Sequence, residues 1–248
     1  MKFSALLLAA FGLAGQVTMT AKPLNVLFIF SDDHAYQAIS AYGSNRNKTP
    51  NIDRLAAEGV QLDRFYSTPI CSPTRAALMT GRDPIRLGVA YSTIMPWHNN
   101  GIHPEETFLP ELFLGAGYQT AMVGKWHLGH AQQSYHPNAR GFEHFYGHLH
   151  TEVGFYPPFA SLGGKDFQRN GVSIDDQGYE SFLLADEVSR YIEERDTTRP
   201  FFIYMPFIAP HTPLDAPDDL QAKYADMPDE RGKSRSKMAD NTRFMAKL

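Results

Sequence analysis

The sequence predicts an α/β fold with a mostly parallel central sheet and helices on both of its faces. Short apolar runs of the length of a buried strand alternate along the chain with segments that indicate helices. This alternation is typical of parallel sheets, in which the chain crosses back between consecutive strands. Ligands of such folds bind at the carboxyl ends of the strands, so we expect a functional site there.

Three apolar runs indicate the strands. They cover residues 25–30, 120–123 and 201–205. Polar residues follow each run, and the first of them are Ser31, Asp32, Asp33 and His34. Because parallel strands end at the same edge of a sheet, we expect the polar clusters after Phe30, Val123 and Met205 to lie along one edge.

Three further segments indicate helices. They cover residues 52–58, 108–116 and 180–194. A plausible capping start, Thr49-Pro50-Asn51, precedes the first helix, and Gly59 is placed to end it. The third segment is the clearest amphipathic helix, because apolar residues line one side of it: Leu184, Val188, Tyr191 and Ile192.

Composition is that of an ordinary globular protein. The chain has 248 residues, of which 43% are hydrophobic and 20% charged, enough for one large domain or two small ones. Its net charge of −4 shows no basic surplus, so we expect no nucleic-acid partner. Composition alone leaves an enzyme, a binding module and a structural domain open.

The first 21 residues have the pattern of a secretory signal peptide. Lys2 precedes an apolar stretch, Ala5–Ala14, that is shorter than the roughly 20 residues needed to span a bilayer. A buried N-terminal helix is the alternative, but no amphipathic pattern supports it. No cysteine follows the apolar stretch, which excludes a lipoprotein anchor. We therefore expect a signal at residues 1–21 and a secreted or periplasmic chain at 22–248 with no stable membrane anchor.

The single cysteine, Cys71, lies just before a predicted helix start. Pro73 suits the first position of a helix, and the residues from Ala76 to Met79 are good helix formers. Backbone N–H groups at a helix start favour an anion, and Arg75 adds a positive charge in the first turn. One cysteine excludes an internal disulfide and any multi-cysteine metal site. A small buried cysteine with no chemical role is the alternative interpretation.

The motif around this cysteine resembles the signature of the type I sulfatases, members of the alkaline phosphatase superfamily. Cys-x-Pro-x-Arg at 71–75 is followed by Thr-Gly-Arg at 80–82, and a second family signature lies at 117–128. Residues 49–55 and 209–213 also match sulfatase segments, so the resemblance runs from Leu24 to about Tyr224. Residues 140–147 are most similar to the arylsulfatase B-like (N-acetylgalactosamine-4-sulfatase) branch.

The resemblance implies the activity and the nucleophile. The substrate would be a sulfated carbohydrate or an aryl sulfate, hydrolysed at its sulfate ester. A formylglycine-generating enzyme would oxidise Cys71 to formylglycine, an aldehyde whose hydrate is the nucleophile. One hydroxyl of the hydrate would attack sulfur, and deprotonation of the other would then expel the sulfate, an exit that a serine ester lacks.

The resemblance also assigns the remaining site residues. Arg75 would stabilise the hydrate, Lys125 would contact it or the sulfate oxygens, and His127 would be the base for its collapse. His211 matches the family histidine near the leaving oxygen and is the candidate acid, also in contact with substrate. Asp32 and Asp33 would bind one Ca²⁺ together with the modified residue 71. Adjacent carboxylates at a strand end favour such a hard cation, although a turn or capping pair is the alternative.

Six of the ten histidines fall between residues 127 and 150. Zinc binding is the alternative for such a cluster, but no His-Glu-x-x-His pair is present and the glycine and proline content indicates a loop. We expect His148 and His150, with Tyr156 nearby, to line the substrate cleft.

Family members are typically almost twice as long, so the resemblance implies an N-terminal catalytic portion, incomplete at its C-terminus. It would lack later metal ligands and a sulfate-contacting lysine, so metal affinity should be weak and one side of the sheet uncovered. Two other functions remain open. One is a phosphodiesterase or phosphonate monoester hydrolase of the same superfamily, and the other is an inactive module that binds sulfated glycans.

Overall fold

The computed structural model describes residues 22–150, 154–158, 164–212 and 214–225. The predicted signal segment at 1–21 lies outside the described residues, and so do residues 226–248. Within the described part no helix is both long and apolar enough to cross a membrane.

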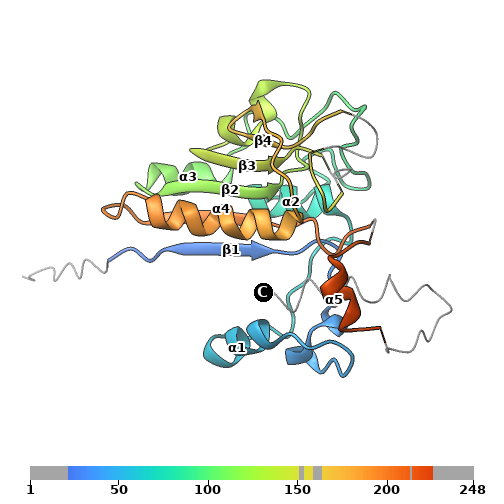
Figure 1. The fold of residues 1–248 in the computed structure, drawn as a ribbon. Helices are drawn as coiled ribbons and strands as arrows, with labels where there is room; N and C mark the ends of the chain where they lie inside the picture. The colour runs from blue at the N-terminus through green and yellow to red at the C-terminus, as the bar shows by residue number, and fades with distance from the viewer. Residues whose placement is uncertain (1–21, 151–153, 159–163, 213, 226–248) are drawn as a thin grey trace, which may run out of the picture.

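A six-stranded sheet forms the centre of the fold (Figure 1), and the predicted α/β class is confirmed. Its spatial order is β1-β6-β2-β3-β4-β5, and the first four strands are mutually parallel. The last two strands are short: β4 pairs with β3 and β5 pairs with β4, both antiparallel. The strands are β1 (Val26–Phe30), β2 (Gln119–Lys125), β3 (His144–His148), β4 (Gln168–Arg169), β5 (Val172–Ser173) and β6 (Phe201–Pro206).

Helices cover both faces of this sheet (Figure 1): α4 (Glu180–Glu194) packs on one face, and α2 (Cys71–Thr80) and α3 (Leu109–Gly115) pack on the other. Helices α1 (Pro50–Glu58) and α5 (Asp218–Ala222) lie away from the sheet. Four short 3₁₀ turns lie at Tyr36–Ala38, Ser40–Tyr42, Gln133–Tyr135 and Pro137–Ala139. The predicted helices are confirmed to within two residues at each end. One detail differs: Cys71 is the first residue of α2 instead of preceding it, and Pro73 is the third.

Alternate residues of the inner strands build two separate cores. Ala121 and Val123 of β2 point to one face, where they pack with Leu184 of α4. Met122 points to the other face, where it packs with Ala76 of α2 and with α3. Since both faces are covered, β2 and β6 are buried along their whole length, which explains why they are continuous apolar runs in the sequence.

Strand β3 was not predicted, because its segment was interpreted as a loop. The segment His144–His148 contains two histidines and a glycine, so it lacks the continuous apolar pattern of a buried strand. All of its residues except His144 are nevertheless buried. Gly147 is required here because it has φ +144° and a Cβ would lie 2.1 Å from the carbonyl oxygen of Gly124. The glycine that suggested a loop therefore permits close pairing with β2.

Strand β1 differs from the prediction of a buried strand. It pairs with β6 on one side only in the described part of the chain, and Leu27 and Ile29 are each 42% exposed. Its other face, with Val26, Phe28 and Phe30, packs partly against the core shared with α2 and α3. Within the described residues, the partly exposed side of the sheet is therefore at β1.

Gly124 in β2 offers a direct test of this packing. A Cβ at Gly124 would lie 2.0 Å from the carbonyl oxygen of Pro206 in β6, and its φ of +133° disfavours any side chain. We expect Gly124→Ala to prevent cooperative folding or to lower the free energy of unfolding by at least about 3 kcal/mol, measured by urea denaturation. Gly115→Ala is the matched control. Nothing lies within 4 Å of its added Cβ, so it should be neutral or mildly stabilising.

A buried carboxylate ties α4 to β3 and β4. Glu187 accepts hydrogen bonds from His144 Nε2 at 2.7 Å, Arg190 Nη2 at 2.6 Å and Arg169 Nη2 at 2.8 Å. Burial alone would raise the pKa of Glu187, but these three partners outweigh it and lower the pKa to about 2.

The Glu187 cluster makes stability depend on acid pH. The folded-state pKa lies below the ordinary value of 4.5, so the stabilisation is complete above pH 4.5 and is lost as pH falls toward 2. We expect Glu187→Gln to cost about 2 kcal/mol at pH 7, with the difference from the unaltered chain disappearing near pH 2 in urea titrations. Glu194→Gln, at a side chain 64% exposed, should cost less than about 1 kcal/mol at any pH. A pH-independent loss in Glu187→Gln would contradict this assignment.

Candidate active site

Three side chains from three different elements meet at one carboxylate oxygen. Asp32 follows the end of β1, Arg75 lies in the second turn of α2, and Lys125 is the last residue of β2. Arg75 Nη2 and Lys125 Nζ both donate to Asp32 Oδ2, at 2.8 and 2.6 Å. Arg75 Nη1 also donates to the carbonyl oxygen of Lys125, at 2.8 Å. The expected gathering of polar residues at one sheet edge is confirmed.

This Asp32–Arg75–Lys125 cluster carries an excess positive charge. All three side chains are at most 5% exposed, so water screens their charges weakly. Burial alone would raise the pKa of Asp32, but Lys125 and Arg75 outweigh it and hold that pKa well below its usual range. Burial lowers the pKa of Lys125, and Asp32 opposes the shift. Two cations share one anion, so a second anion beside them would be stabilised.

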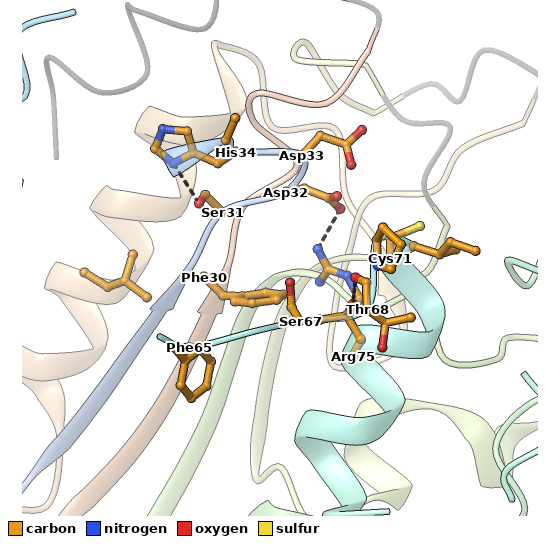
Figure 2. Close-up of a pocket in the computed structure, with 15 residues that line it drawn as sticks. Phe30, Ser31, Asp32, Asp33, His34, Phe65, Ser67, Thr68, Cys71 and Arg75 are labelled. Atoms are coloured by element: carbon orange, nitrogen blue, oxygen red, sulfur yellow. Dashed lines mark hydrogen bonds and ion pairs between the residues drawn. The ribbon is translucent and has the colours of Figure 1, made fainter. Parts of the chain in front are cut away.

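A pocket of about 640 Å³ opens beside this cluster (Figure 2). The end of β1, the segment before α2 and the first turns of α2 line it, and Asp32, Asp33, Cys71 and Arg75 all contribute. Figure 2 shows the carboxylate of Asp32 directed toward the guanidinium of Arg75, while that of Asp33 points away from it. A pocket of this size suits a small organic ligand.

Cys71 lies in the pocket wall at the N-terminal end of α2. Burial raises the pKa of its thiol, and Lys125 and Arg75 only partly oppose that shift. A thiol with a raised pKa stays protonated near neutral pH and is a poor nucleophile. Cys71 is therefore placed in the pocket wall at a helix N-terminus, but its unmodified thiol is a poor nucleophile.

His127 is held in one tautomer beneath the site. Its Nε2 lies 3.1 Å from the carbonyl oxygen of Ile94, which only accepts, so Nε2 must carry the proton. Burial and the Lys125 and Arg75 cations lower the pKa of His127, which keeps the ring neutral. Its Nδ1 therefore presents a lone pair, buried and without a hydrogen-bond partner among the described residues. A neutral imidazole with a free lone pair can accept a proton.

His211 lies in the turn after β6, next to Asp33, as the sequence predicts. Its Nε2 is 3.7 Å from Asp33 Oδ2, and its side chain is 21% exposed. The backbone N–H of Asp32 donates to the carbonyl oxygen of Ala209 at 3.1 Å, which ties this turn to the end of β1. His211 therefore reaches the same edge of the sheet as the three-residue cluster.

The structure places His148 away from a ligand-facing position, which corrects the expectation that it lines the cleft. His148 is fully buried at the end of β3, and its Nε2 lies 3.0 Å from Glu180 Oε1 on α4. Its Nδ1 is hydrogen-bonded to the carbonyl oxygen of His150. With both ring nitrogens engaged inside the protein, His148 holds the fold and does not reach the pocket. His150 lies against the ring of His130, with centroids 4.0 Å apart.

Asp32 and Asp33 could supply only some of the ligands that a calcium ion needs. Both line the pocket with Cys71, but the described residues contain no group of three or more His, Cys, Asp or Glu side chains that could hold a metal ion. This also gives the alternative of a zinc site among the histidines no support within the described part. Calcium takes about 6–8 oxygen ligands, so the two carboxylates would contribute a minority of its shell.

Two buried residues that the sequence analysis missed support the site. Ser72 Oγ donates to the carbonyl oxygen of His127 at 3.0 Å and accepts from the backbone N–H of Ile94 at 3.1 Å. Ser72 occupies a variable position of the Cys-x-Pro-x-Arg motif, so the motif gave no signal for it. Glu180 did leave a signal, because it lies four residues before Leu184 on the apolar side of α4.

Comparison with known proteins identifies relatives over nearly the whole chain. The Sulfatase family matches residues 24–246. Arylsulfatase J of Mus musculus is 35% identical over 205 residues, which cover 80% of this chain and 34% of that protein. N-acetylgalactosamine-6-sulfatase of Sus scrofa is 35% identical over 232 residues, which cover 85% of this chain and 44% of that protein. The chain therefore spans less than half the length of these curated relatives.

A solved structure shares the fold. The structure of BT4656 in complex with its substrate D-glucosamine-2-N,6-O-disulfate matches with a TM-score of 0.68 and 32% sequence identity. The match covers 85% of this chain and 40% of that one.

The neighbouring aspartates provide a matched pair for testing the cluster. We expect Asp32→Asn to lower the free energy of unfolding by at least about 3 kcal/mol, because it leaves Arg75 and Lys125 buried without a counterion. Asp33→Asn should cost less than about 1 kcal/mol, since that side chain is 60% exposed. Chemical denaturation at pH 7 measures both, and equal losses for the two variants would contradict the proposed burial of charge.

Proposed function

Because this chain belongs to the sulfatase family, we propose that it carries the catalytic centre of an enzyme that hydrolyses sulfate esters of sugars. The observation that carries the proposal is the sharing of one Asp32 oxygen by two buried cations beside Cys71. A sulfate monoester is an anion with several oxygens, and the excess positive charge of this cluster complements it. The position of the nucleophile and the binding charge thus coincide in one pocket.

Arg75 and Lys125 have the roles of binding and neutralising sulfate. Arg75 is fixed by hydrogen bonds to Asp32 and to the Lys125 backbone, so its remaining donors have a defined direction. Pre-oriented donors in a buried site stabilise developing negative charge without the cost of reorganisation. These residues would hold the ester so that its sulfur faces residue 71.

His127 and His211 have complementary proton-transfer roles. His127 is neutral with an open Nδ1, the arrangement required of a base. His211 is partly exposed at the same edge of the sheet, with its Nε2 3.7 Å from Asp33 Oδ2, where its ring can donate to a leaving group. We assign His127 to proton abstraction at residue 71 and His211 to the leaving alcohol.

Two groups complete the proposal. Formylglycine formed from Cys71 would supply an oxygen nucleophile, in keeping with a thiol whose raised pKa makes it unreactive. Asp32 and Asp33 would hold part of the shell of a calcium ion, which would neutralise sulfate oxygens. Conversion of Cys71 requires a maturation enzyme, and we propose export to the periplasm or the outside of the cell after that step.

The choice of sugar sulfates rests on the relatives. N-acetylgalactosamine-6-sulfatase and a structure with a bound disulfated glucosamine both concern sulfated sugars. The arylsulfatase B-like branch remains a sequence-based prediction.

The test combines mass spectrometry with turnover. We expect the peptide that carries Cys71 to have lost its sulfur and gained an aldehyde after expression with a formylglycine-generating enzyme. The longest natural form of the protein should then release sulfate from sulfated sugars, and Cys71→Ala should reduce the rate by at least about 10³-fold.

Controls separate the alternatives. Phosphodiester and phosphonate monoester substrates should be turned over more slowly than sulfate esters, and a reversed preference would favour the other hydrolase class. Saturable glycan binding that survives Cys71→Ala, with no sulfate released by the unaltered protein, would identify a binding module instead.

A further inference from the structure

A short turn that follows Ile94 carries an exposed tryptophan, Trp97. The backbone N–H of His98 donates to the carbonyl oxygen of Met95 at 2.9 Å, which closes a turn with Pro96 and Trp97 at its tip. The backbone N–H of Met95 in turn donates to His98 Nδ1 at 3.2 Å. Proline at the second position fixes the backbone, so the turn is held in one conformation.

Trp97 is 65% exposed, although tryptophan is usually a mostly buried residue. The chain has one other tryptophan, Trp126, which is 1% exposed and donates from Nε1 to the carbonyl oxygen of Tyr135. The two tryptophans thus have opposite environments. An aromatic ring held on a fixed turn loses little conformational freedom when a ligand packs on it.

The turn is anchored directly to the catalytic residues. Ile94, the residue before it, accepts from His127 through its carbonyl oxygen and donates to Ser72 through its N–H. The carbonyl oxygen of Pro96 is 3.1 Å from His130 Nε2. Three residues span at most about 10 Å, so the backbone of Trp97 lies within about 10 Å of Ile94. Ile94 contacts Ser72, the neighbour of Cys71, so this bound puts the turn in the neighbourhood of the pocket but outside the residues that line it.

We propose that Trp97 is a stacking platform for the pyranose ring of a sulfated sugar substrate. This inference rests on the proposed function and deepens it, since it assigns the sugar and the sulfate to different contacts. One face of a pyranose ring consists mainly of C–H groups, which pack favourably on the flat face of an indole. Its hydroxyl groups stay at the edges and remain hydrated. The cluster around Asp32 recognises the anion, and Trp97 recognises the ring that bears it.

Binding measurements on the full chain test this platform. The probes are oligosaccharides of chondroitin sulfate, heparan sulfate and carrageenan, with their desulfated forms and inorganic sulfate. Trp97→Ala should weaken binding of the best sulfated oligosaccharide about tenfold by calorimetry, whereas Trp97→Phe should remain within about threefold. Affinity for inorganic sulfate should be unchanged in both variants. Because Trp97 is exposed, its replacement leaves the core intact, and Trp126 fluorescence reports that each variant is folded.

The two tryptophans give a second readout. Sugar binding should shift the emission of the unaltered chain to shorter wavelength, and Trp97→Phe should lose this shift while still binding. Equal oligosaccharide affinity in Trp97→Ala and the unaltered chain would overturn the platform and leave the proposed function standing. Binding of inorganic sulfate without binding of any oligosaccharide would overturn both the platform and the assignment to sugar sulfates.

Discussion

The two hydrogen bonds to Asp32 Oδ2 are the interaction on which the site depends. They join residues separated by 43 and 93 positions in sequence, and each comes from a different element of the fold. Without Asp32, Arg75 and Lys125 would be two like charges buried close together, which proteins avoid. With it, the three side chains become a fixed cluster with one positive charge in excess. The proposed binding of sulfate and the stability of the fold therefore depend on the same atoms.

The position of this cluster follows from the topology of the sheet. Strands β1, β6 and β2 are parallel neighbours, so their carboxyl ends lie together and deliver Asp32, His211 and Lys125 to one edge. Gly124 allows β2 to approach β6 just before Lys125, and Gly147 allows β3 to approach β2 at the same level. The glycines thus allow the strands to pack closely, and the polar residues that follow the strands form the candidate site.

Local patterns in the sequence were sufficient for most of the fold. The apolar runs at β2 and β6 are continuous because both faces are covered, and α4 shows its buried side at helical spacing. Strand β3 escaped prediction because its two histidines have partners on another element, Glu180 and Glu187 of α4, that no local pattern reveals. The expectation for His148 failed for the same reason.

The candidate site shows the same limit. The Cys-x-Pro-x-Arg motif identified Cys71 and Arg75, but it did not reveal that Arg75 is bound to Asp32 or that Ser72 connects His127 to Ile94. Such contacts arise between segments far apart in the chain, and hydrophobic periodicity carries no information about them. Ser72 in particular is a small polar residue, and its structural role is to link the carbonyl oxygen of His127 to the backbone N–H of Ile94.

Strand β1, which is followed by Asp32 and Asp33, has the least packing around it of the parallel strands. Within the described part, β1 has one neighbouring strand, and Leu27 and Ile29 are partly exposed, whereas β2 is enclosed on both sides. Packing alone therefore fixes the end of β1 less firmly than the end of β2. The hydrogen bonds from Arg75 and Lys125 compensate, because both donors are anchored in buried elements. Asp32 is thus positioned by its cationic partners, while the side chain of Asp33 is 60% exposed at the same edge of the sheet.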